Sequence, residues 1–210
     1  MQLEVSDTAL YGLRQTTAGT MHFTPWVGWL PQGIPKGDKE RIVEDRFRAS
    51  IDKAVELGAS GAKLIAVEDI VMDRRSLLKC RFGCNRWGRF WTCQPNMGMS
   101  FQEFMQTLAC YQTALVISTK DPKVSQEVTL AVEKHAMLEL GALYAFALAL
   151  CVACDECAYP DPCRYPHLAR PSLDGLGVDV MKTVEQLGFR VEFDPGGSLL
   201  PSWYSMVLLD

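Results

Sequence analysis

Cysteine dominates the chemistry available to this chain of 210 residues, because seven of its eight cysteines stand in two short windows. We name residues 80–93 the first cysteine loop and residues 151–163 the second cysteine loop. Thiolates are soft ligands that bind zinc, copper(I) and iron–sulfur clusters. The two loops therefore predict metal binding, with ligands drawn from Cys80, Cys84, Cys93, Cys151, Cys154, Cys157 and Cys163.

The second cysteine loop has the spacing C-x2-C-x2-C-x5-C, which brings three thiolates onto one tight turn of chain. Bacterial ferredoxins begin their cluster loops in this way, with a fourth cysteine after three residues and a proline directly behind it. Here Cys163 follows after five residues, within CRYP. Structural zinc sites generally use two C-x2-C pairs with a longer spacer. The spacing therefore favours a [4Fe-4S] cluster, and zinc remains the alternative.

The first cysteine loop, with the spacing C-x3-C-x8-C, supplies one ligand fewer than a cubane cluster needs. A fourth ligand can come from Cys110, from Cys163 or from outside the protein. If none of these cysteines binds, one iron stays open to a substrate heteroatom. The loop thus predicts either a second electron-transfer cluster or an enzyme that uses an open iron as a Lewis acid.

The charges around the two loops differ in sign. The first loop is basic, with no acidic residue between Ser76 and Ser100, whereas three acidic residues lie within the second. Nearby cations favour the reduced state of an anionic cluster, so we expect the first loop to have the higher reduction potential. Paired, solvated loop charges are the alternative interpretation. The residues expected to contact the cofactor are Lys79, Arg81, Trp87 and Trp91.

Composition narrows the class of protein. The formal net charge of −4 gives no basic footprint for nucleic acid. The chain has neither a secretory signal nor an apolar run of the about 18 residues that a membrane span requires. We therefore expect a cytoplasmic protein, in which closely spaced cysteines bind metal more often than they form disulfides.

The spacing of apolar residues predicts an α/β domain over 38–210, preceded by an extended arm rich in Trp and Pro over 1–37. We expect a mixed sheet flanked by helices, with both cysteine loops inserted where strands end. The predicted helices run from Asp38 to a stop at Gly58, from Phe101 to about Cys110, from Pro122 to about Leu140, and over 178–188. The predicted strands cover 62–72, 113–119, 143–150, 190–193 and the closing LLPSWYSMVLL.

Three stretches of the chain resemble DUF2284, a family of predicted metal-binding proteins of unknown function. They are the first loop ending in C-x-P at Cys93 and Pro95, the block CVACDECAYPDPCRYPHLARPSLDGLGVDV, and the closing YSMVLL. The resemblance covers roughly 40–210. Two features depart from it: CQP stands where CPP is expected, and C-x3-C replaces C-x2-C at Cys80 and Cys84. The resemblance implies a metal, specifically iron–sulfur, and supplies no reaction.

The sequence as a whole predicts an iron–sulfur protein with one or two [4Fe-4S] clusters that serves as an electron-transfer or redox-accessory component of a larger enzyme. The alternatives are the open-iron enzyme and a structural zinc module. We expect the chain to bind a redox protein or an enzyme subunit through the arm that contains Trp26 and Trp29. Assembly into a homo-oligomer is a further alternative. Neither nucleic acid nor a membrane is expected as a partner.

Overall fold

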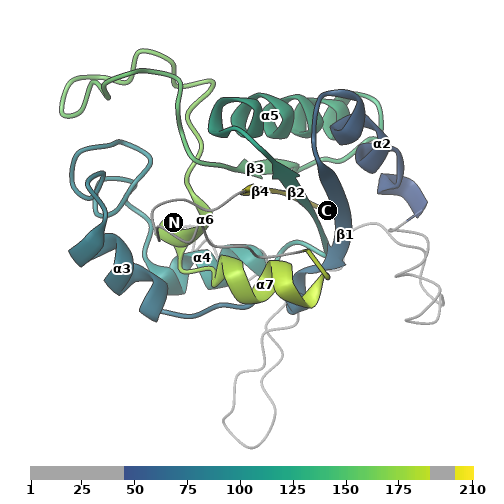
Figure 1. Cartoon of the computed structure of the whole chain (residues 1–210), viewed down its shortest axis with the longest axis horizontal. Coiled ribbons are helices and arrows are strands. Elements are labelled where there is room, and N and C mark those ends of the chain that lie inside the picture. Colours follow the sequence, from purple (N-terminus) through teal and green to yellow (C-terminus); the bar gives the residue numbers. More distant parts are fainter. Residues whose placement is uncertain (1–44, 190–201) are drawn as a thin grey trace, which may run out of the picture. The chain divides into compact units, whose positions relative to one another are not determined.

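The computed structural model of the chain describes residues 45–189 and 202–210 (Figure 1). The predicted arm at 1–37 and the predicted strand at 190–193 lie outside these residues. Among the helices that the structure describes, none is long and apolar enough to cross a membrane.

The core of the fold is a four-stranded sheet with the strand order β1-β2-β4-β3. Every neighbouring pair in it is antiparallel. The α/β prediction is confirmed, but the predicted mixed sheet is wrong. Strands β2 and β3 point the same way, as expected for strands joined by a helix, yet β4 lies between them and runs opposite to both. The strands are β1 (Gly61–Ala66), β2 (Thr113–Thr119), β3 (Phe146–Leu148) and β4 (Trp203–Leu209).

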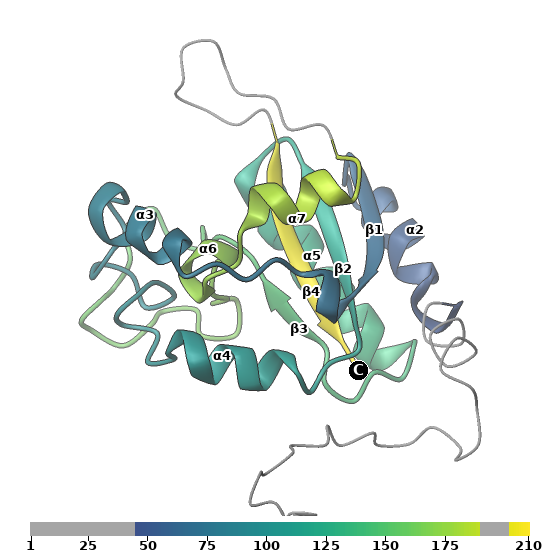
Figure 2. The same cartoon turned by 90° about the horizontal axis from the view of Figure 1, so that it is seen from below.

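Helices cover both faces of this sheet. Helices α2 and α5 lie on one face, and α4 and α7 lie on the other (Figures 1 and 2). Because both faces are covered, every residue of the central strand β2 is buried, and this strand has the bounds that the sequence predicts. The helices are α2 (Ala49–Glu56), α3 (Arg75–Gly83), α4 (Phe101–Leu108), α5 (Pro122–Leu138), α6 (Leu173–Leu176) and α7 (Val180–Gln186), with a 3-10 turn η1 at Val67–Asp69.

Local sequence signals fix where the helices begin. The Ser100 hydroxyl accepts from the backbone N–H of Glu103, and the Glu103 carboxylate accepts from the N–H of Ser100. This capping box starts α4 at Phe101, where the sequence predicts it. The Asp121 carboxylate caps α5 by accepting from the backbone N–H groups of Lys123 and Val124, and Pro122 lies in the first turn. These caps satisfy backbone donors that have no partner inside the helix.

The strands next to the cysteine loops are shorter than predicted. The strand predicted at 62–72 ends at Ala66, where η1 begins, and the strand predicted at 143–150 is reduced to the edge strand β3. The first cysteine loop does not follow a strand end directly, because α3 intervenes and already carries Cys80. Only the second cysteine loop leaves the sheet soon after a strand.

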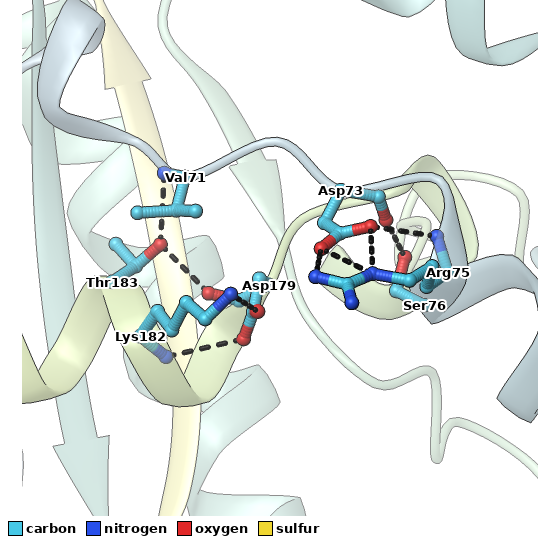
Figure 3. Close-up of polar contacts among 7 residues, drawn as sticks. All are labelled: Val71, Asp73, Arg75, Ser76, Asp179, Lys182 and Thr183. Carbon is cyan, nitrogen blue, oxygen red and sulfur yellow. Dashed lines mark hydrogen bonds and ion pairs between the residues drawn. The ribbon is translucent and has the colours of Figure 1, made fainter.

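Two backbone hydrogen bonds, which we call the ladder, join the segment that leads into α3 to the segment that leads into α7. The N–H of Asp179 donates to the carbonyl of Val71 at 2.7 Å, and the N–H of Asp73 donates to the carbonyl of Gly177 at 2.8 Å. Figure 3 shows that the Thr183 hydroxyl also accepts from the N–H of Val71, at 3.1 Å. The ladder therefore fixes the chain just before α3, the helix that carries Cys80, to the chain just before α7.

The turn into α3 has its own polar contacts. The Asp73 carboxylate accepts from the Arg75 side chain, and Arg75 holds the pKa of this carboxyl well below its ordinary value (Figure 3). The Ser76 hydroxyl donates to the Asp73 carbonyl at 2.8 Å. These contacts fix the start of α3 at Arg75, directly after the ladder.

Gly177, at the end of this ladder, has no room for a side chain. Its φ of +95° lies in the left-handed region, and an added Cβ would overlap the Phe101 ring. We expect Gly177→Ala to lower the free energy of unfolding by about 2–4 kcal/mol, measured by chemical denaturation. Gly98→Ala is the matched control, because Gly98 has a φ of +68° with nothing within 4 Å. It should cost only about 1 kcal/mol, and equal losses in the two variants would contradict the steric argument.

Candidate metal and ligand site

The second cysteine loop gathers its four cysteines around one small hollow. All eight cysteines of the chain are free thiols, so the disulfide alternative has no support. The hollow measures about 20 Å³, enough for a single water molecule. A cubane cluster therefore requires these thiols to move apart. The cysteines that line the hollow are Cys151, Cys154, Cys157 and Cys163.

A single ion would instead require the thiols to converge on one point. Within residues 45–189 and 202–210, no three His, Cys, Asp or Glu side chains are close enough to hold one metal ion. The soft thiol donors and their number suit a metal centre.

Two buried polar side chains of α5 hold both ends of the second loop. The Gln126 side chain accepts from the N–H of Val152 at 2.8 Å and donates to the carbonyl of Leu168 at 2.7 Å. The Glu133 carboxylate accepts from the N–H of Ala147 at 2.5 Å and from two nitrogens of Arg170. Glu133 is buried, and a buried carboxylate paired in this way has a structural role.

The first cysteine loop supplies a wall of the second hollow. The backbone N–H of Trp91 donates to the Cys157 sulfur at 3.5 Å, and its indole N–H donates to the Asp161 carbonyl at 2.8 Å. The Trp91 ring also packs edge-on against Tyr159. The sequence associated Trp91 with the first loop, whereas the structure places it at the second hollow.

The first loop itself opens onto a much larger recess of about 520 Å³. All three of its cysteines, Cys80, Cys84 and Cys93, line this recess. Of the residues expected to contact a cofactor, Lys79 and Trp87 also line it. Arg81 does not, since its guanidinium lies over the Phe82 ring and is exposed. The binding roles of these residues stay predictions.

Neither candidate for a fourth protein ligand lies in the recess. Cys110 is exposed just beyond α4, and its thiol is 3.6 Å from the Gln106 carbonyl. Cys163 lines the second hollow instead. Among the described residues, therefore, only three cysteines line the recess.

Burial controls the protonation of two of these thiols. Burial raises the pKa of Cys80 to about 11, with a smaller contribution from the charge of Asp174. Burial likewise raises the pKa of Cys93 to about 11, although the nearby charge of Arg86 acts in the opposite direction. In the metal-free protein both stay protonated at neutral pH, so binding a metal must release protons.

Sequence reasoning did not identify Asp174 as part of the recess. Asp174 lies in the wall of the recess. Its side chain is accessible to solvent from the recess, but protein atoms surround it on the other sides. This crowding raises the pKa of its carboxyl, and the charge of Lys79 opposes the shift. Its segment, SLDG, carries no local signal that points toward the cysteines.

Arg86 joins the two sites. Its side chain lines the recess and donates to the carbonyl of Cys151, in the second loop, at 2.7 Å. The guanidinium also lies 4.3 Å from the centroid of the Phe90 ring, which lines the second hollow. One cation therefore contacts elements of both cysteine sites. The basic run of the first loop was the signal for a cation here, but the spacing could not indicate its partner.

One family model, described as predicted metal-binding protein (DUF2284), matches residues 63–209. The match extends from β1 to β4 and includes both cysteine loops. No curated protein and no solved structure matches the chain.

Gln126 provides a test of how the second loop is held. Gln126→Ala leaves the N–H of Val152 and the carbonyl of Leu168 without their protein partner, so we expect a loss of about 1–3 kcal/mol in the free energy of unfolding. Hydrogen–deuterium exchange should also become faster at Val152. The control is Glu127→Ala, which alters an exposed neighbour on α5. Unchanged exchange at Val152 would show that Gln126 does not hold the loop.

Proposed function

The chain belongs to the DUF2284 family of predicted metal-binding proteins, and we propose that it is an iron–sulfur protein with one cluster site at each cysteine loop. The observation that carries the proposal is the grouping of the cysteines: four line one hollow and three line a neighbouring recess. The C-x2-C-x2-C spacing of the second loop supports iron–sulfur over zinc.

Within this proposal the second loop holds a cluster by Cys151, Cys154, Cys157 and Cys163. An iron–sulfur cluster supplies one-electron transfer, and an iron without a fourth protein ligand supplies a Lewis-acid position. The protein contributes the surroundings. The N–H of Trp91 donates to the Cys157 sulfur, and the Phe90 and Trp91 side chains line the hollow against water. Hydrogen bonds to ligand sulfurs and exclusion of solvent are means by which a protein sets a reduction potential.

Electron transfer is the function that this pair of sites supports best. Segments of the first loop form part of the second hollow, so the two centres are neighbours rather than independent modules. We therefore propose a redox-accessory component that passes electrons between its two centres and a protein partner. The arm over 1–37 remains our proposed docking element.

A second candidate function is an enzyme, and the recess favours it specifically. Cys80, Cys84 and Cys93 line a cavity large enough for a small molecule, and no fourth cysteine of the described residues lines it. A metal centre held by these three thiols would face the cavity. In this alternative the second centre would provide electrons to the first.

Loss of single cysteines should separate ligands from bystanders. We expect Cys154→Ala to remove about half of the bound iron and to destabilise the fold, because the free energy of metal binding is also folding free energy. Cys110→Ala is the control and should keep full iron content, since Cys110 is exposed and outside both sites. Iron and acid-labile sulfide per chain are the measurements. Full iron in the Cys154 variant would show that it is not a ligand.

Anaerobic purification of the full chain tests the proposed function directly. We expect a brown protein with iron and sulfide in equal amounts and an EPR signal after reduction with dithionite. A colourless protein that contains zinc would overturn both iron–sulfur functions and leave the structural zinc module. If the EPR signal of the reduced protein changes when cyanide or azide is added, the open-iron enzyme is supported over the pure electron carrier.

A further inference from the structure

The recess beside the first cysteine loop has the size of a small-molecule site. Its volume of about 520 Å³ falls within the range of roughly 300–1,000 Å³ that is typical of ligand pockets. Its walls come from α3, the first loop, α6, α7 and the start of β4. The backbone ladder between 71–73 and 177–179 joins the segments that lead into α3 and α7, and α3 packs against α6, so these walls are held together without a ligand.

Three aromatic side chains line the recess. Trp87 comes from the first loop, while Trp203 and Tyr204 come from the start of β4. Leu173 of α6 and Met181 of α7 add aliphatic and thioether surface. Flat aromatic surfaces favour a flat apolar partner, because the rings gain both buried area and stacking or edge contacts.

Three charged side chains of the described residues also line it: Lys79, Arg86 and Asp174. Arg86 already donates to the Cys151 carbonyl and lies over Phe90, so it serves the cysteine loops. Lys79 and Asp174 influence each other electrostatically, yet no direct hydrogen bond or ion pair joins them in the described part of the chain. The Lys79 ammonium is thus placed to meet an anionic group of a ligand.

We propose that this recess binds a small organic acid with a flat apolar body. Lys79 holds the carboxylate, and Trp87, Trp203 and Tyr204 pack against the body. Asp174 repels additional negative charge and so selects a single acid group. The inference rests on the second candidate function above, whose substrate class it names.

Three probes with the same body and different charge test it: 2-naphthoate, 2-naphthylmethanol and 2-naphthylmethylammonium. Isothermal titration calorimetry on the anaerobically purified full chain should show the tightest binding for the acid. Lys79→Gln should weaken binding of the acid roughly tenfold, because it removes a charge-assisted hydrogen bond. Asp174→Asn should tighten acid binding by roughly threefold and weaken binding of the ammonium probe, because it removes a nearby negative charge.

Arg89→Gln is the matched control, since it removes an exposed cation of the first cysteine loop that does not line the recess. It should leave all three affinities unchanged. Equal affinities for the three probes, or equal effects of the Lys79 and Arg89 variants, would overturn the inference.

Iron and sulfide are measured on the same samples, which separates this inference from the proposed function. Absence of acid binding in an iron-loaded chain overturns the ligand assignment alone. Charge-dependent acid binding in a chain that holds zinc supports the ligand assignment and overturns the iron–sulfur proposal. Trp87→Leu, which removes an aromatic wall without a change of charge, should weaken binding of all three probes to a similar degree.

Discussion

The buried carboxylate of Glu133 is the constraint on which the second cysteine site depends. A carboxylate removed from water is stable only when its oxygens are fully paired, and here Arg170 and the N–H of Ala147 provide the partners. Ala147 lies in the strand that leads into the second loop, and Arg170 lies just after the loop. Gln126, two turns earlier on the same face of α5, holds Val152 and Leu168 in the same way. Both ends of the loop are thus tied to one rigid helix, so the loop between them can adjust around a metal without disturbing the sheet.

The first cysteine loop, unlike the second, depends on the other loop for its position. Its entry is fixed by the ladder between 71–73 and 177–179, but beyond α3 its contacts are largely with the second loop, through Arg86 and Trp91. Order in the second loop therefore supports order in the first. Because metal binding also contributes folding free energy, a metal in the second loop would help to assemble the walls of the recess.

The elements that depend on neighbouring residues were predictable from the sequence. The starts of α4 at Phe101 and of α5 at Pro122 and the apolar run of β2 each depend on residues close in sequence, and each lies where predicted. Long-range pairing was not predictable. The sequence does not reveal that β4 would lie between β2 and β3, which makes the sheet antiparallel, nor that Glu133 would meet a partner 37 residues away. For the same reason, cysteine spacing indicated which thiols belong together, but it could not place Trp91 at the second hollow or Asp174 in the recess.

The two sites differ in size and lining, and the difference bears on function. Four thiols line a small hollow walled by aromatic side chains, an arrangement suited to a centre that exchanges only electrons. Three thiols line a larger recess with charged and aromatic walls, an arrangement suited to a centre that also meets a ligand. Arg86 contacts elements of both, and its charge offsets the negative charge that bound thiolates would place on either side. Because Arg86 is already engaged by the cysteine loops, a bound organic acid needs a second cation. Lys79 on α3 can be that cation, because it lines the recess and has no direct ionic partner in the described part of the chain.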